Sequence, residues 1–270
     1  LTEAAAEKIG KAIGHYVTVE AAGLREKNDR LENRLIEILG LHLQQLLNLQ
    51  NDTQILVVGL GNWNVTPDSL GPSVVEKIYV TRHLKAIYPD KIGQGFRNVC
   101  AIAPGVLGLT GIESGEIIFG IVQRLKPDVV IAIDALAARS MRRLNTTIQI
   151  SDTGIYPGSG VGNNRVGITA ENLGIPVIAI GVPTVVDAAT LTSDVIDLLI
   201  HAVQKQTKMD SDLNKMLTAL DNFAQDDKHN LIKEVLAPEV GLLMVTPKEV
   251  DRLLEDISDL LANALNAALH

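Results

Sequence analysis

Residues 55–72 read ILVVGLGNWNVTPDSLGP, and the rest of the sequence can be placed around this stretch. Residues 55–58 form an apolar, largely β-branched run that ends in Gly-Leu-Gly-Asn, which indicates a buried strand that stops at a tight turn. The residues that follow favour turns, so we expect a loop that carries Asp68. In open α/β sheets, ligands bind where strands end, because a crevice is left there. Asp68 is therefore a candidate site residue.

A second carboxylate follows from the same argument. Residues 127–134, PDVVIAID, predict another buried strand, with Asp134 as its last residue and the helix-prone segment ALAAR after it. If the two strands are neighbours in a parallel sheet, Asp68 and Asp134 lie at the same sheet edge. Two carboxylates that close raise the pKa of one of them, so that one can donate a proton while the other accepts one, which suits hydrolysis. The alternative interpretation is that each Asp only caps the turn or helix after its strand.

The remaining sequence alternates strand and helix patterns. We expect strands at residues 15–19, 99–103, 147–151 and 176–180, and helices at residues 1–13, 19–49, 74–84, 116–125, 187–201 and 253–269. The alternating character of residues 147–151 is typical of an edge or antiparallel strand. His83, near the end of its predicted helix, is expected to complement the helix dipole. The pattern predicts a single α/β domain of residues 1–270, with a polar excursion at about 205–233 and a closing C-terminal helix.

The composition narrows the class of protein. Of the 270 residues, 46% are hydrophobic but only 3% are aromatic, so the core must be aliphatic, as in layered α/β proteins. The net charge of −8 argues against a nucleic-acid-binding surface. The single cysteine, Cys100, excludes an internal disulfide and favours an intracellular compartment. We find no apolar run of about 18 residues and no signal peptide. Since the first residue is Leu1, we expect the start of the gene product to be missing.

Other catalytic patterns are incomplete. Asp152-Thr-Gly matches the motif of pepsin-like proteases, but that chemistry needs two such loops on β structure. The Gly-Ser-Gly at 158–160 lacks the Gly-x-Ser-x-Gly spacing of serine hydrolases. The six histidines are scattered, and Gly59-Leu-Gly61 lacks the third glycine of a dinucleotide fingerprint. We therefore expect neither a metal nor a cofactor.

Residues 152–165, DTGIYPGSGVGNNR, form a long loop without internal pattern, and such loops are usually functional or mobile. Its part at 158–164 could direct several backbone N–H groups toward an anion or a developing oxyanion. The alternative is a flexible surface loop. For substrate binding we select Ser159, Gly160 and Asn163 of this loop, together with Asn62 after the first strand quoted above.

Seven segments between about Thr18 and the C-terminus together resemble the germination protease family of spore-forming bacteria. They are LVVGLGNWNVTPDSLGP (56–72), TRHL (81–84), APGVLGLTGIE (103–113), VVIAIDALAARS (129–140), QISDTGIYPGSGVGN (149–163), IPVIAIGVPTVVDA (175–188) and MVTPKEVD (244–251). The resemblance implies a fold similar to that of the hydrogenase-maturation endopeptidases, a three-layer α/β/α architecture with a mostly parallel sheet.

The resemblance also implies a function. Such a protein is an endopeptidase of the cytoplasm of the spore core, made as an inactive zymogen and active on germination. It cleaves the small, acid-soluble proteins that coat spore DNA. The implied mechanism is that of an atypical aspartic peptidase that is metal-independent, uses no cofactor and has Asp68 and Asp134 as its catalytic residues. A homotetramer is implied, without direct contact to nucleic acid or membrane.

The sequence departs from the family in two places. The N-terminal propeptide and the start of the mature chain are absent before Leu1, and the polar stretch at 205–233 looks shorter than in the family. Two alternatives stay open. One is a metal-dependent, maturation-type peptidase of the same fold, although no histidine matches the nickel ligand of those enzymes. The other is a non-catalytic spore protein that binds an anion through residues 59–62 and 158–164.

Overall fold

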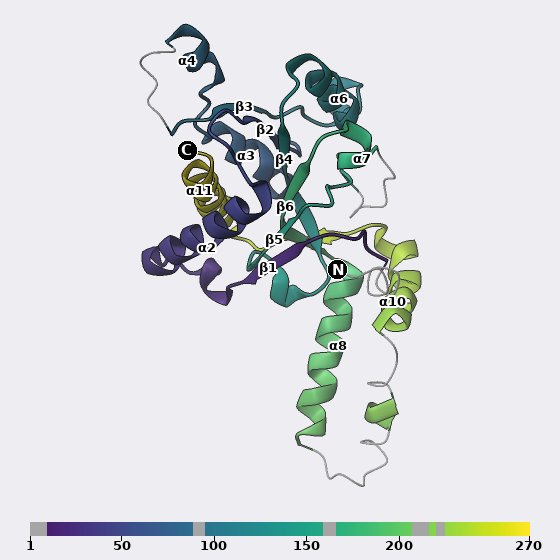
Figure 1. Ribbon diagram of the computed structural model, residues 1–270. Coiled ribbons are helices and arrows are strands. Elements are labelled where there is room, and N and C mark those ends of the chain that lie inside the picture. The colour runs from purple at the N-terminus through teal and green to yellow at the C-terminus, as the bar shows by residue number, and fades with distance from the viewer. Residues whose placement is uncertain (1–9, 89–94, 159–165, 207–215, 220–224) are drawn as a thin grey trace. The chain divides into compact units, whose positions relative to one another are not determined.

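The computed structural model describes residues 10–88, 95–158, 166–206, 216–219 and 225–270 (Figure 1). The chain forms two compact units. The first consists of Leu1–Leu136, Asn145–Thr184 and Lys248–His270, and the second of Ala137–Leu144 and Val185–Pro247. The polar excursion predicted at 205–233 belongs to the second unit. The prediction of a single domain stays a prediction.

The sheet has the strand order β1-β5-β6-β4-β2-β3, and β7 pairs with β6. The strands are β1 (Tyr16–Glu20), β2 (Gln54–Gly59), β3 (Asn98–Ile102), β4 (Val129–Ala138), β5 (Thr147–Ser151), β6 (Val177–Asp187) and β7 (Met244–Val245). β2 is parallel to β3 and β4, with Ile55 opposite Val129, so the two predicted strands are parallel neighbours. β5 is antiparallel to β1 and β6, as its alternating sequence predicted. The α/β class is confirmed, and the sheet is mixed.

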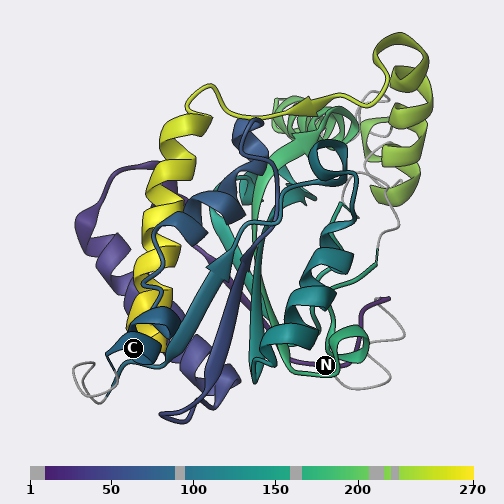
Figure 2. The same ribbon diagram turned by 90° about the horizontal axis from the view of Figure 1, so that it is seen from above.

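Helices cover both faces of the sheet in the first unit. They are α2 (Asp29–Leu47), α3 (Leu70–Glu76), α4 (Arg82–Ile87), α5 (Leu107–Thr110), α6 (Ser114–Leu125), α7 (Ala170–Leu173) and α11 (Val250–Leu269), with the short 3-10 turns η1 (Ala22–Arg25) and η2 (Thr66–Asp68). Figure 2 shows α2 (purple) and α11 (yellow) side by side against one face and α6 (teal) against the other.

The core divides along the same two faces because side chains alternate along each strand. Ile55 and Val57 of β2 pack with the buried leucines of α2 and α11, whereas Leu56 and Val58 pack with Ile118 of α6. In β4, Ile131 and Ile133 belong to the first cluster, and Val130 and Ala132 to the second. The alternation continues to Asp134, which therefore lies on the face that α6 covers.

The predicted end of the Asp134 strand is wrong. β4 continues to Ala138, so Asp134 lies inside the strand and the segment after it is not a helix. Its neighbour β6 is also long and runs through Gly181 and Pro183 to Asp187, beyond the predicted end at residue 180. Pairing between two long strands outweighs the helix propensity of the alanines that follow Asp134, because propensity is a weak effect that tertiary context overrides.

The helix predicted at 74–84 is also wrong, since α3 ends at Glu76 and α4 begins at Arg82. Between them, the side chain of Asn266 on α11 replaces the helical hydrogen bonds: its Nδ2 donates to the carbonyl of Lys77 (3.0 Å), and its Oδ1 accepts from the N–H of Tyr79 (2.9 Å). His83 consequently lies in the first turn of α4, where it cannot complement a helix C-terminus. The helix predicted to begin at residue 19 begins at Asp29, after the N-cap Asn28, whose side chain accepts from the N–H of Leu31.

The second unit contains η3 (Met141–Arg143), α8 (Ala188–Gln204), α10 (Gln225–Val240) and β7. Asp187 caps α8 by accepting from the N–H and the hydroxyl of Thr190 (2.9 and 2.6 Å). A largely buried ion pair between Lys228 and Asp197 (2.9 Å) links α10 to α8. In the part of the chain that the structure describes, no helix is long and apolar enough to cross a membrane.

Candidate active site

The loop between β2 and α3 folds back on itself and returns Asp68 to the end of β2. The N–H of Asn62 donates to the carbonyl of Asp68 (3.0 Å), and the N–H of Asp68 donates to the carbonyl of Val65 (2.8 Å). At its start, the N–H of Leu60 donates to the carbonyl of Ile133 on β4 (2.7 Å). The backbone of the Asp68 loop is thereby tied to the residue that precedes Asp134.

Two glycines make this close return possible. Gly61 has φ +118°, a conformation that side chains disfavour, and a Cβ there would overlap the carbonyl oxygen of Asp68. A Cβ on Gly71 would overlap the backbone of Leu60 and the carbonyl oxygen of Ile133. The Gly-x-Gly that weakly suggested dinucleotide binding therefore serves to bring the loop against the strand ends.

Asp134 is buried, with 7% of its surface exposed. Its Oδ1 accepts a hydrogen bond from the N–H of Ala135 (2.9 Å), which favours the charged form. Burial disfavours the charged form, and the negative charge of Asp68 does so as well; together they raise the pKa of Asp134 to about 7. The structure thus brings the two predicted aspartates into one site. Near neutral pH the site holds Asp134 in both its protonated and its charged forms.

Of the four residues predicted to bind substrate, the structure describes Asn62. Asn62 shapes the loop: its side-chain oxygen accepts from the N–H of Asn64 (3.0 Å), and its backbone binds Asp68. A role for Asn62 in substrate binding stays a prediction. Ser159, Gly160 and Asn163 lie outside the described residues.

Sequence reasoning missed three residues near Asp68. Thr184 of β6 is fully buried, and its hydroxyl donates to the carbonyl of Pro67 (2.6 Å), the residue before Asp68. Trp63 and Val65 are 49% and 44% exposed and place apolar side chains on the surface of the Asp68 loop. The sequence contained a signal for Trp63 and Val65, because large apolar residues inside a polar turn cannot pack into the core. Thr184 carried no such signal.

The Asp-Thr-Gly at 152–154 has a structural role in the described residues. Both oxygens of the Asp152 carboxylate accept from His15, one from its N–H and one from Nδ1, each at 2.7 Å. Burial raises the pKa of Asp152, but the hydrogen bonds from His15 outweigh it and hold that pKa below its ordinary value. Gly154, with φ +79°, lets the chain turn closely past Ile168. The carboxylate of Asp152 therefore anchors the segment before β1.

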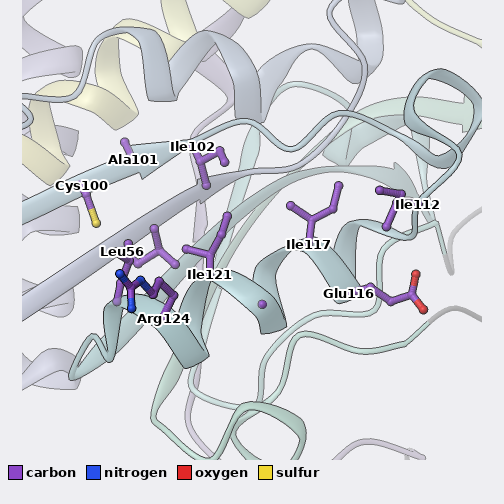
Figure 3. Close-up of a pocket in the computed structure, with 11 residues that line it drawn as sticks. Leu56, Cys100, Ala101, Ile102, Ile112, Glu116, Ile117, Ile121 and Arg124 are labelled. Carbon is purple, nitrogen blue, oxygen red and sulfur yellow. The ribbon is translucent and has the colours of Figure 1, made fainter.

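An apolar groove of about 560 Å³ lies between α6 and the edge strand β3 (Figure 3). Its lining includes Leu56, Ile102, Ile117 and Ile121, and the charged residues Glu116 and Arg124 lie toward its two ends. Leu56 belongs to the same face of the sheet as Asp134. None of the residues that we predicted as site residues lines this groove.

The geometry defines a class of protein: an α/β protein with a pair of carboxyl groups, one buried inside the central strand β4 with a raised pKa, the other on the loop that follows the parallel strand β2. The sequence matches a model of the germination protease family over residues 1–225 and 208–270. The chain belongs to the germination protease family, a family of peptidases of spore germination.

Two germination proteases are similar to this chain along its whole length. A germination protease from Caldanaerobacter subterraneus is 52% identical over 269 residues, which cover 100% of this chain and 82% of the relative. One from Bacillus cytotoxicus is 47% identical over 301 aligned residues, with the same coverage of both chains. Because 301 exceeds the 270 residues of this chain, the Bacillus protein has additional residues inside the aligned region. That they fall at 205–233, where we expected this chain to be shorter, stays a prediction.

A solved structure is also similar to this chain. A NiFe hydrogenase maturation protease from Thermococcus kodakarensis is 16% identical, with a TM-score of 0.39, and the match covers 83% of this chain and 98% of that one.

Proposed function

We propose that this chain is an endopeptidase that starts the degradation of small, acid-soluble, DNA-coating spore proteins during germination, and that Asp68 and Asp134 hydrolyse the peptide bond. The observation that carries the mechanism is the pair itself: a buried Asp134 with a pKa raised to about 7, beside Asp68. Groups that work as general acids or bases at neutral pH need pKa values near 7, which ordinary aspartates lack.

Hydrolysis of the peptide bond needs two proton transfers, one from the attacking water to the aspartate pair and one from the pair to the leaving amine. A water molecule attacks the carbonyl carbon of the peptide bond and gives a proton to the carboxylate of the pair. The protonated carboxyl gives its proton to the nitrogen of the leaving amine, and the C–N bond breaks. The pair then holds one proton again, on the other carboxyl. Since two coupled groups titrate together, we assign the two roles to the pair and not to single residues.

The other parts of the proposal rest on membership in the family. They are the small acid-soluble spore proteins as substrates, a zymogen form, a homotetramer, a location in the cytoplasm of the spore core, and a mechanism without metal or cofactor. The geometry adds one observation on metal binding. Within the described ranges, no three His, Cys, Asp or Glu side chains gather as metal ligands do. Asp68 and Asp134 therefore lack a third such ligand among these residues.

The test is cleavage of a purified small acid-soluble spore protein by the full-length protein in its mature form, with EDTA present. We expect the wild type to cleave and the Asp68→Asn and Asp134→Asn variants to be inactive while still folded. The control is Asp128→Asn, because Asp128 lies on the surface just before β4 and its carboxylate only accepts from the N–H of Gln54 (2.7 Å). An asparagine can still accept that bond, so this variant should cleave normally.

Three results would count against the mechanism. Loss of wild-type cleavage in EDTA, restored by added nickel or zinc, would favour the metal-dependent peptidase. Full activity of both Asp→Asn variants would leave the pair without a catalytic role, and binding of an anion without cleavage would favour the non-catalytic alternative.

A further inference from the structure

We infer that Thr184 is a positioning residue for the aspartate pair: its hydroxyl holds the carbonyl of Pro67 and so keeps Asp68 beside Asp134. The inference rests on the proposed function, since it assigns a role within that site. Thr184 itself is fully buried, so it has no exposed surface in the site.

The hydrogen bond joins the loop to a third strand of the sheet. β6 is the neighbour of β4, the strand that carries Asp134. Ile178, Ile180 and Val182 of β6 pack against the helices of the α11 face, and the alternation continues to Thr184. The Thr184 side chain therefore points to the face on which η2 and α3 follow β2. There its hydroxyl donates to the carbonyl of Pro67 at 2.6 Å.

η2 is consequently held from two sides. Asn62 binds the carbonyl of Asp68 from within the loop, while Thr184 binds the carbonyl of Pro67 from the sheet. These two carbonyls belong to consecutive residues, so a shift of Pro67 moves the backbone of Asp68. The Pro67 nitrogen carries no hydrogen and cannot supply a bond of its own. The hydrogen bond from Thr184 links η2 to β6.

Replacing the hydroxyl by a methyl group has a calculable effect. A methyl carbon approaches a carbonyl oxygen to about 3.3 Å, so Thr184→Val forces Pro67 outward by roughly 0.7 Å from its present 2.6 Å contact. A displacement of this size lowers catalytic rates strongly when it moves a reacting group. It also changes the distance between Asp68 and Asp134, and with it their repulsion, which depends on distance. A purely structural role for Thr184 would lower stability without changing that repulsion.

The experiment therefore reads the titration of Asp134 directly, by carboxyl carbon NMR, in the full-length mature protein. For Thr184→Val we expect the midpoint to move by on the order of 0.3 pH unit, and kcat/KM for a small acid-soluble spore protein to fall about tenfold or more. Thr184→Ser keeps the donor and should restore both values. Thr184→Ala lacks the donor without adding a clash, so it tests the hydrogen bond alone and should also move the midpoint from the wild-type value.

Thr81→Val is the matched control. Thr81 is also buried and its hydroxyl also donates to a backbone carbonyl, that of Arg97, but it lies beside β3. This variant should lose thermal stability and keep the wild-type titration of Asp134. Wild-type titration in both Thr184→Val and Thr184→Ala, or unfolding of both, would overturn the positioning role. The titration of Asp134 can be measured whether or not the protein cleaves its substrate. Failure of the positioning role is therefore distinguished from failure of the proposed function, which would appear as inactive wild-type protein.

Discussion

Asp134 is buried on β4 beside Asp68, and burial together with the charge of Asp68 raises the pKa of Asp134 to about 7. The loop that brings Asp68 there is closed by its own backbone, from Asn62 to Asp68 (3.0 Å), and is tied to β4 through Leu60 and Ile133 (2.7 Å). The raised pKa is thus a property of the fold around β2 and β4.

Removal of the Asp68 charge should lower the pKa of Asp134. Asp68→Asn keeps the shape of the side chain but removes its negative charge, which is the second cause of the raised pKa of Asp134. The first cause, the burial of Asp134, is unchanged. We therefore expect the Asp134 midpoint to fall below that of the wild type and to stay above the ordinary value of about 3.9. Carboxyl carbon NMR of the variant gives the midpoint, with Asp128→Asn as a control that should leave it unchanged. An unchanged midpoint in Asp68→Asn would mean that burial alone sets the pKa.

The stability of the protein should fall as the pH rises from about 4 to about 7 because of Asp134. Its pKa is near 3.9 in the unfolded chain and about 7 in the folded one. Between these values the folded state binds more protons than the unfolded state, so the free energy of unfolding decreases with pH. Below the lower value both states are protonated and the penalty is absent. Above pH 7 the penalty is complete, at several kcal/mol on this shift.

Asp134→Asn removes that penalty. We expect the variant to be more stable than the wild type at pH 8, by a few kcal/mol, and the difference to vanish toward pH 4. Urea unfolding of both proteins at several pH values measures it. Parallel stability curves for the two proteins across this range would show that Asp134 does not have the raised pKa.

Gly61→Ala should damage both the fold and the site. The residue has φ +118°, and a Cβ would overlap the carbonyl of Asp68, so the loop must move. A strained backbone of this kind costs about 1–3 kcal/mol, and displacement of Asp68 should reduce cleavage. The control is Gly108→Ala in α5, where a Cβ meets nothing within 4 Å and φ is not positive. Thermal unfolding and cleavage assays of both variants give the comparison, and equal behaviour would refute the steric account.

Asn266→Ala should destabilise the protein without altering the site. The side chain is 8% exposed and satisfies one carbonyl and one N–H between α3 and α4, and both would be left unpaired. We expect a loss of about 2–4 kcal/mol in the free energy of unfolding. Asn263→Ala, on the exposed face of the same helix, should change stability little. Denaturant unfolding of the two variants tests this, and equal losses would show that the two hydrogen bonds contribute nothing specific.

Much of the fold could be predicted because its signals are local. The apolar run at 55–58 and the run before Asp134 identified β2 and the first part of β4, and the alternation at 147–151 identified β5 as an antiparallel strand. The turn residues after β2 indicated that Asp68 lies in a loop and not in a helix, and the structure has the 3-10 turn η2 there. The argument for the aspartates assumed that the strand before Asp68 and the strand that carries Asp134 are parallel neighbours, and the structure confirms that pairing of β2 with β4.

Two of the errors have the same physical cause: a contact from elsewhere in the chain overrode a local pattern. The alanines after Asp134 form a strand because β6 lies alongside them. The helix expected at 74–84 divides because Asn266, 189 residues from Lys77, takes over its hydrogen bonds. A sequence window of ten or twenty residues does not include such a distant partner, so the pattern within the window cannot indicate the contact.

The sequence by itself determined the α/β class and identified Asp68 and Asp134 as candidate site residues, since periodicity and turn chemistry act within a few residues. Only the tertiary structure decided how the aspartates are held. The pKa of Asp134 depends on its burial and on the charge of Asp68. The position of Asp68 depends on glycines that admit close backbone contact and on Thr184, which lies 117 residues from Pro67 in the chain. Burial and hydrogen bonding across such separations exist only once the strands have paired.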